Sequence, residues 1–382
     1  MSAAHPRYAK IACEKGGVAT DRIARFRQAG VSIWLDVLSR DLLESGEFAT
    51  LVLNGWVSGV TSNPTIFANA ITKSTRYDNQ LRAALAAGMR DSQELFFELA
   101  LEDVRRAAAV LRPVHRSSGG GDGFVSFECT PDLAEATEAT VAQATMLWKR
   151  LDLPNVMIKV PATNAGVTAI EQLTVRGVNV NVTLLFSVDR YEQVIEAYLS
   201  GLESRVAQGL PIDSLRSVAS FFVSRVDAKV DPQLDAGSPL RGRVAIANAQ
   251  RAYGHYRERF AGKRWAQLQQ QGAMTQRPLW ASTGTKNAAY SDVLYVEQLI
   301  ARDVINTMPE ATLLAFADHG YVSVFDADAA ERVISEATAA GIDLHPITAQ
   351  LEREGIEAFR TSYDQLLRCI AAKAARLAVP TT

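Results

Sequence analysis

Short apolar runs alternate with longer helical patterns through most of this sequence, and few folds accept that order. The runs begin near Val31, are rich in Val, Ile, Phe and Leu, and are mostly bounded by Gly, Pro, Asn or Asp, as β-strands commonly are. Eight strands, each followed by a helix, predict a (β/α)8 TIM barrel, and a doubly wound open sheet is the alternative. The expected strands are Val31–Val37, Val57–Ser62, Phe124–Cys129, Asn155–Val160, Val178–Phe186, Ser217–Val223, Pro278–Ser282 and Thr312–Ala317.

The segments outside this alternation are expected to be additions to one barrel. Two loops rich in Gly, Ser or Pro, residues 116–123 and 232–242, lack the composition of an inter-domain linker, so a single domain over residues 1–382 is predicted. Within it, residues 1–30 are expected to form a helical N-terminal extension and residues 343–382 to form C-terminal helices. The three consecutive glycines that start at Gly119 precede a strand, which favours a flexible loop over a dinucleotide-binding turn.

Composition excludes several classes of protein. Forty Lys and Arg against forty-two Asp and Glu give a formal net charge of −2, so no overall field favours nucleic acid or an anionic membrane. The sequence shows neither a signal-peptide pattern nor about 18 consecutive apolar residues. Three distant cysteines without a CxxC pair indicate a reduced, cytoplasmic protein. The histidines are not at metal-ligand spacing, so no metal is expected; a homo-oligomer is compatible with the sequence.

Polar side chains interrupt the expected fifth strand with a period of two. Successive residues of a barrel strand point alternately to the interior and to the helix layer. Asn179, Asn181 and Thr183 share one face there, while the valines and the leucine between them share the other. Buried amides and hydroxyls need partners, so an interior polar column predicts a wet or ligand-lined cavity. Trp34 and Trp280 are also expected to fill the interior.

Charged and amide side chains gather at the ends of other strands. Lys159 lies between Ile158 and Val160, so alternation points it inward, where a lysine seldom lies without a purpose. Five other polar or charged residues also follow predicted strands, and each taken alone has an ordinary explanation as a helix cap, a turn residue or a solvated charge. Together they lie at the carboxyl ends of predicted strands, the face on which barrel enzymes keep their chemistry. These other groups are Asp36, Asn63, Glu128, Arg225 and Lys286.

Three segments resemble the transaldolase family. Residues 59–65 (Gly-Val-Thr-Ser-Asn-Pro-Thr) are similar to its motif after the second strand, and residues 158–163 (Ile-Lys-Val-Pro-Ala-Thr) to the segment around its Schiff-base lysine. Residues 179–186 (Asn-Val-Asn-Val-Thr-Leu-Leu-Phe) closely match its fifth-strand signature. The motifs occur in order, and the resemblance covers roughly residues 31–320.

The resemblance assigns a role to each site residue. Lys159 would attack the ketose carbonyl, Asp36 would handle the proton of the hydroxyl beside the C–C bond that breaks, and Glu128 with Thr183 would hold and activate a water. Phe222 would shape the pocket around that water. The remaining roles concern substrate binding: Asn63, Asn181 and Ser220 would hydrogen-bond the dihydroxyacetone unit, and Arg225 with Ser282 would grip a phosphate. The family's best-known branch has Arg after the Ala-Ser of the seventh strand, whereas Lys286 is the nearby cation here, as in a second branch.

The chemistry implied is transfer of a three-carbon unit without metal or cofactor. Lys159 would form an imine with fructose 6-phosphate or sedoheptulose 7-phosphate, and Asp36 would then deprotonate the C4 hydroxyl as C3–C4 breaks. The bound enamine would attack erythrose 4-phosphate or glyceraldehyde 3-phosphate, as in the pentose phosphate pathway. Lys159 must be neutral to attack. Desolvation favours that form, while the nearby carboxylates of Asp36 and Glu128 oppose it, and we expect desolvation to prevail.

Two other functions are compatible with parts of this pattern. A fructose 6-phosphate aldolase would release the three-carbon unit, but those relatives have Gln where Glu128 stands and Tyr where Phe222 stands. A non-catalytic sugar-phosphate-binding barrel would need neither Lys159 nor both carboxylates. The sequence therefore favours a transferase.

Overall fold

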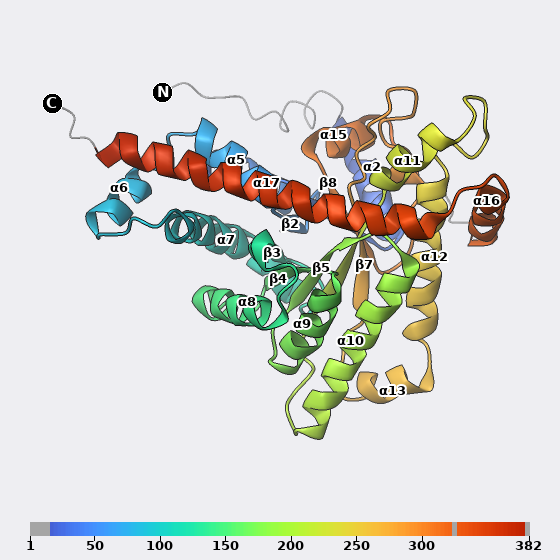
Figure 1. Cartoon of the computed structure of the whole chain (residues 1–382), viewed down its shortest axis with the longest axis horizontal. Coiled ribbons are helices and arrows are strands. Elements are labelled where there is room, and N and C mark those ends of the chain that lie inside the picture. The colour runs from blue at the N-terminus through green and yellow to red at the C-terminus, as the bar shows by residue number, and fades with distance from the viewer. Residues whose placement is uncertain (1–15, 323–326, 379–382) are drawn as a thin grey trace.

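The computed structural model describes residues 16–322 and 327–378. Its centre is a closed barrel of eight parallel strands in sequential order, with helices around it (Figure 1). The (β/α)8 prediction is confirmed, and the open doubly wound sheet is excluded because β1 pairs with β8. The strands are β1 Val31–Leu35, β2 Gly59–Thr61, β3 Val125–Glu128, β4 Val156–Pro161, β5 Val180–Leu185, β6 Ser217–Phe222, β7 Gln276–Ala281 and β8 Val304–Met308.

The position of the eighth strand was predicted wrongly. Thr312–Ala317 lies within helix α15 (Glu310–His319), and the strand is Val304–Met308, just before that helix. The apolar run Thr-Leu-Leu-Ala-Phe-Ala suits a buried helix as well as a strand, and periodicity alone does not separate the two. The other seven predicted strands overlap observed ones, with ends that differ by a few residues.

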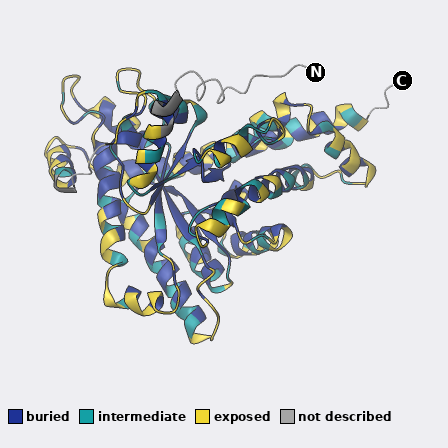
Figure 2. Cartoon of the chain, turned by 180° about the vertical axis from the view of Figure 1, so that it is seen from behind, coloured by how far each residue is buried: buried dark blue, intermediate teal, exposed yellow. Residues whose placement is uncertain are grey.

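Helices enclose the barrel and bury their inner faces against it (Figure 2). The first described helix, α2, lies in the predicted N-terminal extension, whose residues 1–15 are outside the described residues. The α-helices are α2 Gly16–Gln28, α3 Arg40–Glu44, α4 Glu47–Leu53, α5 Pro64–Lys73, α6 Asp78–Ala86, α7 Ser92–Ser117, α8 Thr137–Leu151, α9 Asn164–Val175, α10 Val188–Ala207, α11 Ser224–Val230, α12 Val244–Arg259, α13 Lys263–Gln269, α14 Leu294–Glu297, α15 Glu310–His319, α16 Ala327–Ala339 and α17 Leu344–Ala378. Two short 3-10 helices are η1 Pro131–Leu133 and η2 Asp231–Gln233.

The C-terminal helix α17 crosses the molecule from the side of α16 to that of α6 (Figure 1). It contacts α5, α6, α7, α11 and the end of β5. Its far end is fixed by Lys373, whose buried ammonium donates to the carbonyl of Ile71 (3.0 Å) and pairs with Asp78 (2.8 Å). Gly355 lets the helix approach the barrel closely, because a Cβ there would lie 2.9 Å from Cδ2 of Leu184. The helix is thus packed against the carboxyl end of the barrel.

The glycine-rich loop before β3 closes the opposite end of the barrel. Arg216 donates to the carbonyls of Gly119 (3.2 Å) and Gly120 (2.7 Å). The indole nitrogen of Trp34 donates to the carboxylate of Asp122 at 2.8 Å. These contacts anchor a segment whose composition alone indicated only flexibility.

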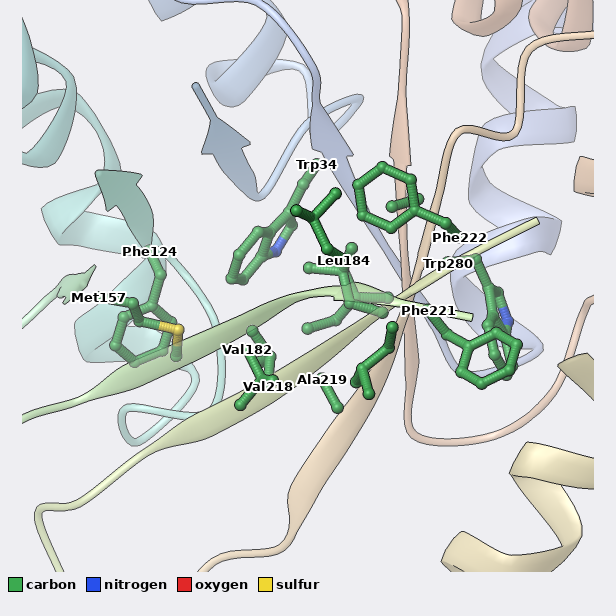
Figure 3. Close-up of a cluster of buried hydrophobic side chains, with 14 of the residues drawn as sticks. Trp34, Phe124, Met157, Val182, Leu184, Val218, Ala219, Phe221, Phe222 and Trp280 are labelled. Carbon is green, nitrogen blue, oxygen red and sulfur yellow. The ribbon is translucent and has the colours of Figure 1, made fainter. Parts of the chain in front are cut away.

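Of the two tryptophans expected inside the barrel, only one lies there. Trp34 shares the face of β1 with Asp36, which lines the interior cavity described below. Trp280 lies on the opposite face of β7 from Ala281, which lines that cavity. Its indole nitrogen donates to the carbonyl of Leu299 at 3.0 Å, and its ring packs edge-on against Phe221 (Figure 3). Trp280 therefore belongs to the helix layer, and the prediction for it was wrong.

Candidate active site

A cavity of about 180 Å³ opens at the carboxyl ends of the strands, beneath α17. This is the face on which TIM-barrel enzymes assemble their sites. Most of the predicted site residues lie on its wall, although they come from distant parts of the sequence. The lining residues are Asp36, Thr61, Asn63, Lys159, Thr183, Ser220, Phe222, Arg225, Ala281, Ser282, Gly284, Lys286, Thr307, Pro309 and Phe359.

Lys159 projects from β4 into this cavity. The side chains of Ile158 and Val160 on either side are fully buried, as the alternation predicted. The Lys159 amine donates to the carbonyl of Ser62 (3.1 Å) and lies 3.5 Å from Oε2 of Glu128. Glu128 is its register partner on β3, so the parallel pairing itself brings the two groups together. The lysine is only 5% exposed, which gives it one accessible direction, toward the cavity.

Glu128 is a buried carboxyl group with an altered proton affinity. Its pKa is raised to about 7, mainly by burial; the Lys159 ammonium opposes the rise, and the nearby Asp36 carboxylate adds to it. A carboxyl group with a pKa near neutrality can both give and take a proton at physiological pH. No helix begins at Glu128, so the alternative explanation of a helix cap does not hold.

Asp36 faces Lys159 from the end of β1. Its carboxylate accepts a hydrogen bond from Thr61 (2.9 Å), whose hydroxyl lies 2.7 Å from that of Thr307. Burial raises the pKa of Asp36, while Lys159, the Thr61 hydrogen bond and Arg225 lower it. The following helix is capped by Ser39, so Asp36 is not a helix cap either. An ionised Asp36 is thus a stronger base than a solvated carboxylate.

Thr183 presents an unpaired hydroxyl to the cavity. Its Oγ1 is buried and has no hydrogen-bond partner in the structure. The next residue, Leu184, has a positive φ of 57°, and the register between β5 and β6 shifts between Val182 and Leu185. This irregularity interrupts the regular pairing of β5 around Thr183, as bulges beside functional sites often do. A buried hydroxyl without a partner indicates a place for water or substrate.

Asn181 lies beneath the cavity wall instead of on it. It is fully buried, and its amide nitrogen donates to Ser126 (2.8 Å), while its oxygen accepts from Ser220 (2.7 Å). Ser220 itself lines the cavity. Both ends of the Asn181 amide are therefore engaged in fixing the serine that faces the ligand space.

Asn63 has two functions available at the start of α5. Its side-chain oxygen accepts from the backbone nitrogen of Ile66 (3.0 Å) and caps the helix, which was the ordinary explanation for this residue. The cap leaves the amide nitrogen unused, and the residue lines the cavity. An Asn held in this way offers a fixed donor.

Two cations lie together on the far side of the cavity. Desolvation lowers the pKa of Arg225, although Asp36 and Glu354 oppose the effect. Desolvation and the charge of Arg225 lower the pKa of Lys286. The Arg225 guanidinium is held over the ring of Phe222, 5.3 Å from its centroid. Adjacent, partly desolvated cations provide a site for an anion such as phosphate.

Hydroxyl groups and a strained residue complete this end of the site. Ser282 has a positive φ of 56°, and its hydroxyl lies 3.0 Å from that of Ser224. Non-glycine residues in this conformation are uncommon and cluster at ligand sites. The hydroxyls of Ser282 and Ser224 lie at the same strand ends as the two cations.

Six cavity residues were not predicted from the sequence: Thr61, Ala281, Gly284, Thr307, Pro309 and Phe359. Thr61 lies within a quoted motif, and its hydrogen bond to Asp36 could have been suspected from its position at a strand end. Thr307 lies in the strand that was misplaced. Phe359 comes from α17, about two hundred residues from Lys159, and no local sequence signal marks it.

Within residues 16–322 and 327–378, no group of three or more His, Cys, Asp or Glu side chains could hold a metal ion. No helix within those same ranges has the length and apolar character needed to cross a membrane.

Sequence comparisons agree with the geometry of the site. The profile of the transaldolase/fructose-6-phosphate aldolase family matches residues 33–370. A transaldolase of Saccharopolyspora erythraea is 49% identical over 349 residues, which cover 90% of this chain and 94% of that protein. A transaldolase of Frankia alni is 47% identical over 363 residues (93% and 98%), and transaldolase 2 of Streptomyces coelicolor is 46% identical over 369 residues (94% and 99%).

The closed barrel, with a buried lysine beside carboxyl groups at the carboxyl ends of its strands, defines a TIM-barrel enzyme. The chain belongs to the transaldolase/fructose-6-phosphate aldolase family. Within that family it is a transferase of the transaldolase type.

Proposed function

We propose that this enzyme transfers a dihydroxyacetone unit from sedoheptulose 7-phosphate to glyceraldehyde 3-phosphate, reversibly, through a Schiff base on Lys159. The products are erythrose 4-phosphate and fructose 6-phosphate, as in the pentose phosphate pathway. The observation that carries the proposal is the buried Lys159 amine, 3.5 Å from Glu128 and in one cavity with Asp36. A lysine is seldom buried beside two carboxyl groups unless it has a chemical task.

The first steps form the imine. The neutral amine of Lys159 attacks C2 of the ketose phosphate, and the resulting carbinolamine loses its hydroxyl as water. Glu128, with a pKa of about 7, supplies the proton for that departure and takes one back from water in the reverse step. The unpaired hydroxyl of Thr183 gives this water a second partner.

The carbon–carbon bond then breaks and re-forms. Asp36 removes the proton of the C4 hydroxyl, C3–C4 breaks, the aldose phosphate leaves, and the bonding electrons enter the iminium to give an enamine. The enamine carbon attacks the aldehyde carbon of the acceptor, and Asp36 returns its proton to the new hydroxyl. Ser220 and Asn63 provide hydrogen bonds for the three-carbon unit, while Arg225, Ser282 and Lys286 hold the phosphate.

Two residues favour transfer over release of the three-carbon unit. Glu128 and Phe222 both differ from the Gln and Tyr expected of a fructose 6-phosphate aldolase. Phe222 has no hydroxyl to place beside the enamine, and its ring faces Arg225. The enamine therefore has no phenolic hydroxyl beside it that could supply a proton before an acceptor arrives.

The test measures glyceraldehyde 3-phosphate formed from fructose 6-phosphate, with and without erythrose 4-phosphate. Wild-type protein should require the acceptor, Lys159→Ala should lose turnover, and Lys149→Ala, on the exposed face of α8, should retain it. Rapid release of dihydroxyacetone without acceptor would instead indicate an aldolase. Retained sugar-phosphate binding with no turnover in the wild type would indicate a binding protein.

Other expectations from the sequence remain part of the proposal. We place the enzyme in the cytoplasm as a single domain over residues 1–382, with sugar phosphates as its ligands. It would need no cofactor and bind neither nucleic acid nor membrane, and a homo-oligomer is compatible with it.

A further inference from the structure

The segment that carries Lys286 is tied to the rest of the chain by Tyr290 and, at its two ends, by Thr283, which donates to Asn306 (2.9 Å), and Asp292, which lies 2.8 Å from His319. Residues 286–289 between β7 and α14 are exposed. Within the segment, Thr285 donates to the carbonyl of Ser291 (2.8 Å), and the Asn287 side chain accepts from a nearby backbone nitrogen. Among the described residues, residues 284–291 make one side-chain hydrogen bond to a part of the chain outside residues 284–293. It runs from the Tyr290 hydroxyl to Oδ2 of Asp231, at 2.6 Å. Between those two ends, the position of Lys286 depends on what holds Tyr290.

Asp231 is fixed in turn by its own surroundings. It is buried, its Oδ1 accepts from the backbone nitrogen of Gly242 (3.0 Å), and its carbonyl accepts from Arg241 (2.6 Å). Gly242 has a positive φ of 73°, and a Cβ there would lie 3.0 Å from the ring of Tyr290. The glycine thus allows the tyrosine ring to lie close against the loop that holds its carboxylate partner.

This carboxylate directly follows the helix that carries the other cation. Arg225 is the second residue of α11 (Ser224–Val230), and Asp231 begins η2 immediately after it. The same helix carries Asp227, which is 1% exposed and accepts from Tyr295 (3.0 Å) and from the backbone nitrogen of Ala245 (2.8 Å). Two tyrosine–carboxylate pairs therefore join α11 to the chain that follows β7.

We propose that the Tyr290–Asp231 pair is a positioning clamp that holds Lys286 opposite Arg225 and thereby sets the preference for phosphorylated over unphosphorylated sugars. This proposal rests on the proposed role of the two cations in phosphate binding. A lysine on a free loop would lose conformational freedom each time a phosphate bound, whereas a clamped loop has already lost it. Lysine also lacks the rigid fork of arginine, so its backbone position matters more.

The variant that tests the clamp is Tyr290→Phe, which keeps the ring against Gly242 and removes only the hydroxyl. The matched control is Tyr198→Phe, which removes a buried tyrosine hydroxyl that donates to the carbonyl of Met274 (2.8 Å), outside the cavity. Two readouts apply: kcat and KM with glyceraldehyde 3-phosphate and with unphosphorylated glyceraldehyde as acceptors, and binding of inorganic phosphate by calorimetry. Circular dichroism confirms that each variant is folded.

Tyr290→Phe should raise KM for glyceraldehyde 3-phosphate about tenfold and weaken phosphate binding similarly, with kcat and the KM for glyceraldehyde nearly unchanged. Tyr198→Phe should change neither the KM for glyceraldehyde 3-phosphate nor the binding of phosphate. Equal effects on both acceptors, or unchanged phosphate binding in a folded Tyr290→Phe variant, would overturn the clamp. Absence of transfer by the wild-type enzyme would overturn the proposed function instead, and phosphate binding would still decide the clamp.

Discussion

The acid limb of the pH–rate profile should belong to Glu128. Burial raises the pKa of this carboxyl group to about 7, and its ionised form is the one that takes a proton from water when the imine is hydrolysed. About half of the molecules would carry that form at pH 7 and about one in eleven at pH 6, so kcat should fall roughly tenfold per pH unit below about 7. Above that pH the rate should level off as long as imine hydrolysis, the step that uses the ionised form, limits turnover.

Acid unfolding driven by the titration of Glu128 cannot produce the same fall in rate. The pKa of Glu128 is raised in the folded state, so its contribution to stability is fully present below the unfolded value and is lost as the pH rises through about 7. Acid therefore favours the folded state as far as Glu128 is concerned. A loss of rate on the acid side, with the fold intact by circular dichroism, reports the chemistry.

The assay is the coupled transfer reaction at saturating fructose 6-phosphate and erythrose 4-phosphate, followed across this pH range. Glu128→Gln cannot ionise, so it should lose the limb and about 10²- to 10⁴-fold in kcat. Glu138→Gln, on the exposed face of α8, is the control and should keep both. If the Glu128→Gln enzyme retained a limb at the same pH, or if the wild-type profile were flat there, the assignment would be refuted.

Three further substitutions test other parts of the structure. Thr183→Val removes an unpaired hydroxyl, so kcat should fall about ten- to hundredfold while the melting temperature hardly changes. Gly355→Ala places a Cβ 2.9 Å from Leu184, and the overpacking cost of about 1–3 kcal/mol should exceed the gain in helix propensity of about 1 kcal/mol, as urea unfolding would show. Asp103→Ala leaves the buried guanidinium of Arg40, now 2.9 Å from Asp103, without its partner, so the free energy of unfolding should fall by about 3–5 kcal/mol. An unchanged kcat in the first variant, or unchanged stability in either of the others, would contradict the reasoning.

The barrel was predictable because strands and helices have different periodicities. The eighth strand was misplaced because, in a short apolar run, periodicity does not separate a strand from a buried helix. β8 contains Asn306 and Thr307 within five residues, so it is less apolar than the run in α15 that was taken for it. The polar residues have tertiary reasons: Thr307 faces Thr61 in the cavity, and Asn306 accepts from Thr283 at 2.9 Å. Neither partner is near in sequence, so a local pattern could not reveal the strand.

In the site too, the features set by the local sequence pattern were predictable, and those set by tertiary contacts were not. Alternation along β4 was enough to point Lys159 inward, and strand ends were enough to gather Asp36 and Glu128 on one face. Alternation could not show that Asn181 is covered by Ser220, because that depends on which atoms satisfy each other between strands. Nor could it show that Phe359 reaches the cavity, since the path of α17 is set by packing against α5 and the end of β5.

The most direct test of the central claim is to trap the imine. The protein is incubated with fructose 6-phosphate in the absence of acceptor, reduced with borohydride, and digested for peptide mass spectrometry. We predict a reduced dihydroxyacetone adduct on the peptide that contains Lys159, and none on the peptide that contains Lys149. An unmodified Lys159, in folded protein shown to bind the sugar phosphate, would contradict the Schiff-base mechanism.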